Sequence, residues 1–304
     1  MKKHFLCAPL LLSLLLLLTG CAKAPEPVEI AATTLPVYEF TRDLCRGTDL
    51  SVGRLVTESV SCLHDYSLNV NQVRLAEQAE VLVLSGAGLE DFMEDLLTGK
   101  PSIDASQGIP LLEGEEHDHE DHEDHEDHED HEDHDGHAHE FDPHIWLSPE
   151  NAKIMVQNIC LGLIRQYPQW ETVFKDNLQE LLARLDTLEQ YGKEALSNLD
   201  CRELITFHDG FSYFAQAFDL QILAAVEEES GSEASAKELI GLIRLARAHA
   251  LPAVFVEKNG SASAADILCR ETGAKKATLD MAMAGDSYFD AMYHNIDTIK
   301  EALG

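Results

Sequence analysis

Imidazole and carboxylate side chains, which are zinc-binding groups, are concentrated in one stretch of this sequence. From His119 to Trp146 the stretch reads HEDHEDHEDHEDHEDHDGHAHEFDPHIW. Nine histidines lie in or just before this repeat: His117, His119, His122, His125, His128, His131, His134, His137 and His139. Exposed histidine-rich tracts bind metal ions. The repeat therefore predicts a set of auxiliary weak zinc sites; the alternative is low-complexity drift with incidental metal binding.

The same segment is unable to form a core. Between Glu113 and Asp142 it holds 17 Asp and Glu residues and no Lys or Arg. So charged a segment buries too little apolar surface to offset the entropy lost on ordering. We therefore expect residues 113–141 to form a disordered loop whose end is fixed by the apolar FDPHIW. The formal net charge is -33, of which about -16 lies outside this segment, and so acidic a protein is not expected to bind nucleic acid.

Four further side chains share one topological position. His64 lies in the loop after the second expected strand, and His144 follows the last expected strand of the first half of the chain. His208 ends the segment ELITFH, and Asp280 ends KKATLD. Open α/β sheets bind ligands beyond the carboxyl ends of their parallel strands. Two residues from each half would place three imidazoles and one carboxylate in a cleft, which is a suitable set for four-coordinate zinc.

Each of these residues alone has a simpler interpretation. His208 could be a hydrogen-bonded structural histidine at an apolar strand end. His64 could be a solvated residue of a polar loop, and Asp280 could cap the following turn. His144 could stack on the neighbouring indole. Glu257, at another strand end, competes with Asp280 for the carboxylate position.

Strands and helices alternate in both halves of the chain, which favours parallel sheets covered by helices. Helical periodicity prevails over residues 149–199 and is broken at YPQW; the part from Trp170 to Leu199 predicts a rod of roughly 45 Å at 1.5 Å per residue. We predict an α/β fold of two lobes, joined by a long helix, with a metal site in the cleft between them. The expected strands cover residues 29–36, 50–56, 81–86, a short piece near 103, 203–208, 220–226, 253–258 and 275–280.

The N-terminus has the pattern of an exported, lipid-anchored protein. Lys2 and Lys3 precede an apolar run that ends at Leu18, which is shorter than the roughly 20 residues of a spanning helix. The sequence LTGC then resembles a bacterial lipobox, which makes Cys21 the lipidated residue of a protein tethered to the extracytoplasmic face of the membrane. An uncleaved membrane anchor is the alternative.

The expected domain organisation follows from these features. Residues 1–20 form the signal peptide, 21–28 a tether, 29–168 the N-terminal lobe, 169–199 the connecting helix and 200–304 the C-terminal lobe. The cysteines that are left after cleavage and lipidation show no metal-ligand spacing and establish no disulfide: Cys45, Cys62, Cys160, Cys201 and Cys269.

The lipobox, the two expected lobes, the acidic histidine loop and the motif DPHIWLSP together resemble the zinc/manganese substrate-binding lipoproteins of bacterial ABC transporters. The resemblance covers essentially the whole mature chain. DPHIWLSP implies that His144 is a ligand, FHDGFSYFAQAFDL implies the same for His208, and TLDMA with GDSYFDAMYHNID implies it for Asp280. The segment LHDYSLNVNQ departs from the family pattern: it keeps His64 and Tyr66 but lacks two prolines and a glutamate.

The resemblance implies an extracytoplasmic, monomeric protein that hands zinc to the permease subunits of an ABC transporter. Manganese-preferring relatives tend to carry glutamate at the position of His208, and three imidazoles with one carboxylate favour zinc over manganese. A manganese-binding protein and a surface metal buffer or adhesin are alternatives. A zinc hydrolase is less favoured, because it needs an open coordination position and a general base, and the sequence has no HExxH motif.

Overall fold

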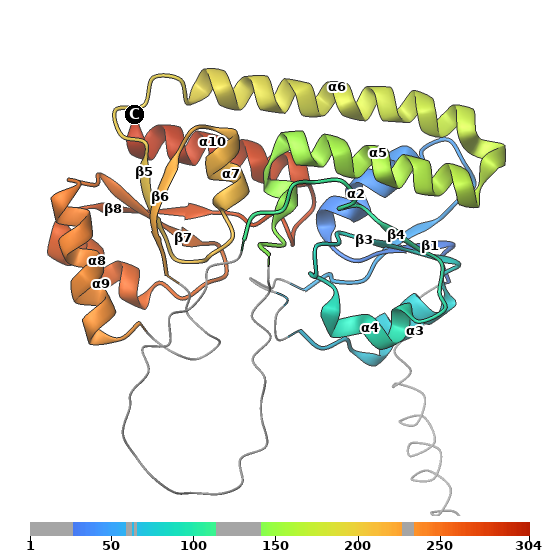
Figure 1. Cartoon of the computed structure of the whole chain (residues 1–304), viewed down its shortest axis with the longest axis horizontal. Helices are drawn as coiled ribbons and strands as arrows, with labels where there is room; N and C mark the ends of the chain where they lie inside the picture. Colours follow the sequence, from blue (N-terminus) through green and yellow to red (C-terminus); the bar gives the residue numbers. More distant parts are fainter. Residues whose placement is uncertain (1–26, 59–62, 64–65, 114–140, 227–233) are drawn as a thin grey trace, which may run out of the picture.

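The computed structural model describes residues 27–58, 63, 66–113, 141–226 and 234–304 (Figure 1). The signal peptide, Cys21, Cys62, His64 and the nine histidines of the repeat lie outside the described residues. Among the described residues, no helix is both long enough and apolar enough to cross a membrane. The four cysteines that are described are free thiols: Cys45, Cys160, Cys201 and Cys269.

Two four-stranded parallel sheets form the centres of two lobes, as predicted (Figure 1). The strand orders are β2-β1-β3-β4 and β6-β5-β7-β8, so both sheets have the same arrangement. The strands are β1 (Ile30–Ala32), β2 (Val52–Arg54), β3 (Val81–Leu84), β4 (Ser102–Asp104), β5 (Glu203–Thr206), β6 (Gln221–Ala225), β7 (Ala253–Glu257) and β8 (Lys275–Leu279). The seven strands that were predicted with bounds are all shorter than the sequence pattern predicts, because the pattern does not show where hydrogen bonding between strands ends; β4 lies where a short strand was expected.

Helices cover both faces of each sheet. In the first lobe these are α2 (Leu35–Leu44), α3 (Val70–Gln78), η2 (Asp91–Met93), α4 (Glu94–Leu97) and α5 (Pro149–Gln166), with η3 (Ile145–Leu147) before α5. The second lobe has α7 (Ser212–Ala217), α8 (Ala236–Ala248), α9 (Ser263–Thr272) and α10 (Tyr288–Leu303). Local sequence signals explain several starts: Asn69 and Ser235 form capping boxes at α3 and α8, and Ser148 accepts a hydrogen bond from Asn151 N at α5.

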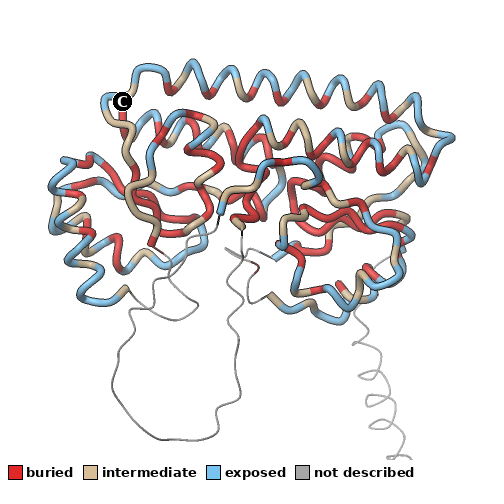
Figure 2. The backbone as a smooth tube through the Cα atoms, in the orientation of Figure 1, coloured by how far each residue is buried: buried red, intermediate tan, exposed pale blue. Residues whose placement is uncertain are grey.

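The long helix α6 (Glu171–Ala195) follows the short η4 (Pro168–Trp170) and runs along both lobes (Figure 1). Its buried stripe includes Leu181, Leu185 and Leu188, at helical spacing. One apolar core is continuous through both lobes, joining β1 to β7 by way of α5, α6 and α10. The buried tube segments in Figure 2 follow this path below α6. The connection between the lobes is therefore a packed one.

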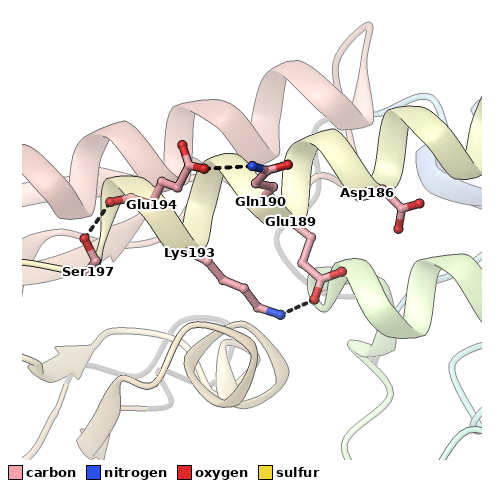
Figure 3. A pocket seen from close by; sticks show the side chains of 6 residues that line it. All are labelled: Asp186, Glu189, Gln190, Lys193, Glu194 and Ser197. Carbon is pink, nitrogen blue, oxygen red and sulfur yellow. Dashed lines mark hydrogen bonds and ion pairs between the residues drawn. The ribbon is translucent and has the colours of Figure 1, made fainter.

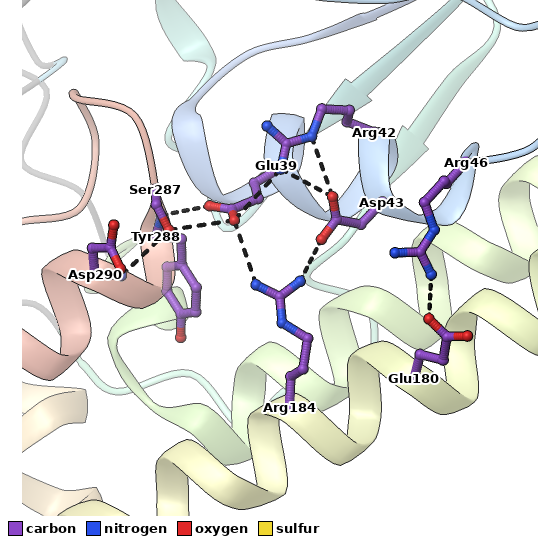
Figure 4. A network of polar contacts seen from close by, with 9 residues as sticks. All are labelled: Glu39, Arg42, Asp43, Arg46, Glu180, Arg184, Ser287, Tyr288 and Asp290. Carbon is purple, nitrogen blue, oxygen red and sulfur yellow. Dashed lines mark hydrogen bonds and ion pairs between the residues drawn. The ribbon is translucent and has the colours of Figure 1, made fainter.

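A polar network also ties the lobes together (Figure 4). Glu39 of α2 is 3% exposed and accepts a hydrogen bond from the backbone N–H of Tyr288, at the start of α10, at 2.5 Å. Burial raises the pKa of the Glu39 carboxyl, although the Tyr288 N–H opposes this. Arg184 of α6 donates to Asp43 at 2.5 Å and lies 3.8 Å from Glu39. Helices α2 and α10, one from each lobe, and the linking helix α6 thus meet at the buried carboxylate of Glu39.

Candidate metal centre

Two of the predicted ligands, one from each lobe, face each other at the junction of the lobes. His144 precedes η3 and His208 lies two residues after β5, and both are buried, with exposures of 1% and 8%. Their Nε2 atoms are 3.5 Å apart. Two nitrogens bound to one tetrahedral zinc at about 2.0–2.1 Å stand about 3.3–3.4 Å apart. The separation in the structure therefore suits a shared zinc ion.

A carboxylate holds the His144 ring from behind. Asp142 Oδ1 accepts hydrogen bonds from the backbone N–H of His144 at 2.9 Å and from its Nδ1 at 2.8 Å. An ionised carboxylate only accepts hydrogen bonds, so Nδ1 carries the proton and the Nε2 lone pair points toward His208. Metal-binding histidines commonly donate their second ring N–H to a carboxylate in this way. The local sequence DPH sets this geometry.

Glu257 stands behind His208 in the corresponding position. Its Oε2 lies 3.5 Å from Nδ1 of His208, and the side chain is buried at the end of β7. Burial raises the pKa of Glu257 to about 7; the neighbouring Asp280 also raises it, and His144 opposes the rise. Because Glu257 faces Nδ1 and not Nε2, its place favours a supporting role for this residue over the competing ligand role.

Asp280 lies in a small hollow of about 70 Å³ beside these residues, which Glu257, Lys258 and Met281 also line. Its Oδ1 accepts a hydrogen bond from Ala282 N at 2.9 Å, and its Oδ2 is 3.0 Å from Lys258 Nζ. The carboxylate is thus engaged by a lysine that the sequence analysis did not single out. Lys258 and Asp280 meet because β7 and β8 pair in a particular register, and the sequence alone does not show that register.

The described residues hold an incomplete ligand set. Within them, no three or more His, Cys, Asp or Glu side chains lie close enough together to hold a metal ion. His144 and His208 meet, Asp280 is adjacent, and His64 lies outside the described part of the chain. The assignment of all four residues, His64, His144, His208 and Asp280, as ligands therefore stays a prediction.

The two lobes are fastened next to this site. Trp146 is fully buried, and its Nε1 donates a hydrogen bond to the carbonyl of Met281 at 2.7 Å, one residue after Asp280. The Tyr288 hydroxyl donates to the Trp146 carbonyl at 2.8 Å. The ring of Trp146 also packs edge-on against His144. The indole that follows His144 thus fixes the position of both lobes beside the facing imidazoles.

A second hollow lies along α6 and is a groove of about 490 Å³ (Figure 3). Its polar groups bond to one another: Lys193 pairs with Glu189, and Gln190 Nε2 donates to Glu194 at 2.8 Å. The six lining residues include no histidine and no cysteine. This groove does not have the donors of a zinc site, so the facing histidines remain the candidate centre.

Comparison with known proteins tests the predicted family. Residues 30–302 match the family model described as ZnuA, zinc-uptake complex component A, periplasmic. The chain belongs to this family. A high-affinity zinc uptake system protein ZnuA of Bacillus subtilis is 29% identical over 291 residues, which cover 91% of this chain and 88% of the relative.

Other members of the family are similar over the same region. The zinc-binding protein AdcA of Streptococcus pyogenes is also 29% identical over 91% of this chain, which spans only 56% of that longer relative. A crystal structure of ZnuA superposes with a TM-score of 0.75 at 28% identity and covers 92% of this chain and 100% of that one. The predicted family and the two-lobed fold are therefore confirmed.

Proposed function

We propose that this protein is the extracytoplasmic zinc-binding component of an ABC transporter and delivers the ion to a membrane permease. The observation that carries the proposal is the pair of Nε2 atoms 3.5 Å apart, one from each lobe. The names of its relatives, a high-affinity zinc uptake protein and a zinc-binding protein, support zinc as the ion. Binding and release of an ion, without catalysis, is the activity proposed.

The proposed ligand set is His64, His144, His208 and Asp280. Three imidazoles and one carboxylate favour zinc over manganese, although manganese stays the alternative ion. Asp280 is proposed to exchange its contact with Lys258 for the metal. Four protein ligands fill a tetrahedral site and leave no open position for a substrate, so a hydrolase is less favoured.

The anchor and the partners are also part of the proposal. Cys21 is proposed to carry lipid that tethers a monomeric protein to the membrane, where the permease subunits receive zinc. Mass spectrometry of the protein isolated from membranes tests the anchor: lipid on an N-terminal Cys21 is expected, and an intact segment 1–20 would contradict it.

The histidine repeat is proposed to supply weaker, auxiliary zinc sites. The structure offers a clean way to test this, because Glu113 and Phe141 form an isolated antiparallel bridge. Replacing residues 114–140 with a short turn should therefore leave the fold in place. Calorimetry should then show one tight zinc site retained and the weak sites lost. Loss of the tight site as well would mean that the repeat supplies essential ligands.

Zinc-limited growth after deletion of the gene distinguishes transport from buffering. A strain that needs extra zinc, and is rescued by the wild-type protein but not by His144→Ala, is the expected result. Normal growth at low zinc would favour a metal buffer or adhesin.

A further inference from the structure

The hydroxyl of Tyr213 joins the two ends of the segment that carries the histidine repeat. It accepts a hydrogen bond from the backbone N–H of Leu112 at 2.9 Å and donates one to the carbonyl of Asp142 at 3.0 Å. Asp142 N also donates to the Leu112 carbonyl at 3.0 Å. The Tyr213 side chain is 1% exposed. The single buried hydroxyl of Tyr213 thus satisfies the backbone N–H of Leu112, before the repeat, and the backbone carbonyl of Asp142, after it.

These contacts cross from one lobe to the other. Tyr213 lies on α7, five residues after His208, whereas Leu112 and Asp142 belong to the first lobe. In Figure 1, α7 lies on the side of its lobe that faces the first lobe, and α7 contacts η3, which precedes α5. The hydroxyl therefore fastens the segment of His208 to the segment of His144.

Asp142 links this hydroxyl to the metal centre. The backbone carbonyl of Asp142 receives the Tyr213 O–H, while its Oδ1 receives both N–H groups of His144. Its other oxygen, Oδ2, is buried and has no hydrogen-bond partner within the part of the chain that the structure describes. The described contacts of the carboxylate are at Oδ1, where it accepts from Nδ1 and from the backbone N–H of His144, so its direction depends on how firmly the backbone around Asp142 is held.

We propose that Tyr213 is a positioning residue of the metal centre: by fixing the backbone of Asp142, it keeps the His144 ring in the tautomer with Nδ1 protonated and Nε2 directed at His208. The expected effect of Tyr213 on zinc binding rests on the proposed function. The tautomer itself is a property of the protein without metal. The two can therefore be tested separately.

The test uses Tyr213→Phe in the full mature chain. Tyr167→Phe is the matched control, because Tyr167 is also buried and its hydroxyl donates to Glu80, at 3.2 Å, away from the site. Long-range proton–nitrogen NMR of the metal-free protein should show His144 protonated at Nδ1 in the wild type and in the control. Tyr213→Phe should show both tautomers.

Zinc titration in competition with a chelator gives the second measurement. Changes behind a metal ligand typically lower affinity 10- to 100-fold, and Tyr213 acts one step further away, so a loss of about 3- to 10-fold is expected. The double variant Tyr213→Phe, Asp142→Asn should bind zinc no more weakly than Asp142→Asn alone. If Tyr213→Phe does not fold, Tyr213→Met removes the hydroxyl while keeping an apolar side chain.

The outcomes separate the two proposals. A wild-type tautomer and wild-type affinity in Tyr213→Phe would overturn the positioning role, as would a loss that adds fully to that of Asp142→Asn. If the wild-type protein itself binds no zinc tightly, the proposed function fails, and the tautomer measurement still decides the role of Tyr213.

Discussion

Asp142 and Glu257 occupy corresponding places behind the two facing histidines, one in each lobe, but they hold their partners differently. Asp142 accepts two hydrogen bonds from His144, with the Nδ1 contact at 2.8 Å. Glu257 stands 3.5 Å from Nδ1 of His208, and burial raises its pKa to about 7. Asp142 therefore holds the first-lobe imidazole in place in the metal-free protein, whereas the contact that Glu257 makes with the second-lobe imidazole is longer and depends on pH.

The largest effects are expected from removing either imidazole. His144→Ala and His208→Ala should each lower zinc affinity more than about 100-fold, because loss of a ligand should exceed the 10- to 100-fold cost of changes behind ligands. Competition titration of the protein lacking residues 114–140 measures this without the repeat. Asp280→Ala should cost less, since water can replace a carboxylate. An unaltered affinity in either histidine variant would remove that residue from the ligand set.

Replacing the two supporting carboxylates, Asp142 and Glu257, should lower zinc affinity by different amounts. Asp142→Asn is expected to weaken zinc binding by about 10- to 100-fold, and Glu257→Gln by less than about tenfold, because only Asp142 makes short hydrogen bonds to its histidine. The same titration compares the two. Equal losses would show that the tighter geometry at Asp142 has no energetic consequence.

The raised pKa of Glu257 predicts opposite trends with pH. In the metal-free protein, the pKa of the Glu257 carboxyl is raised from 4.5 to about 7. The protonated carboxyl therefore stabilises the fold below pH 4.5, relative to high pH, by up to about 3 kcal/mol. This stabilisation is lost as the pH rises through 7. Zinc affinity should instead fall as pH drops through 7, because Glu257 loses its charge. It should fall further in more acidic solution, because imidazoles bind zinc only in their neutral form.

Glu257→Gln provides the control for both trends. Thermal unfolding of the metal-free variant should vary less between pH 5 and 8 than that of the wild type. Its zinc affinity should lose the part of the decline that begins near pH 7. A wild-type affinity that is flat from pH 7.5 to 5 would argue against a site made of histidines.

The smallest effect is expected at Lys258. Its ammonium would compete with zinc for Asp280, the proposed ligand, but the lysine side chain is 58% exposed, and exposed ion pairs contribute at most about 1 kcal/mol. Lys258→Gln should therefore raise zinc affinity by no more than about fivefold. Lys276→Gln, which removes a lysine paired with Asp266 on the outside of the same lobe, is the matched control. A loss of affinity in Lys258→Gln would show that Asp280 needs the lysine.

The parts of the fold that sequence predicted well are those with strong local signals. The alternation of apolar runs and helical periodicity gave both sheets, and the leucine spacing gave α6, within a few residues of its ends. The strand predicted over residues 29–36 stops at Ala32 and α2 starts at Leu35, because Pro36 fits the first turn of a helix as readily as it ends a strand.

The site was predicted less completely. Strand ends located His144 and His208, because carboxyl ends of parallel strands meet at one edge. Asp142 went unnoticed within the acidic run, although its spacing of two residues before His144 could have indicated a carboxylate behind the ring. Tyr213 and Lys258 carry no local signal at all. Their roles arise from contacts between segments that are distant in sequence, such as the 71 residues between Asp142 and Tyr213.

The apolar core that runs through both lobes has a consequence for the lifetime of the protein outside the cell membrane. Because this core is shared, an ion bound at the junction would stabilise both lobes against unfolding and not one of them alone. At a free zinc concentration about 1,000 times the dissociation constant, this linkage amounts to about 4.1 kcal/mol. Proteases that cleave unfolded chains would then remove empty molecules first, so the surviving population would be enriched in those that carry cargo.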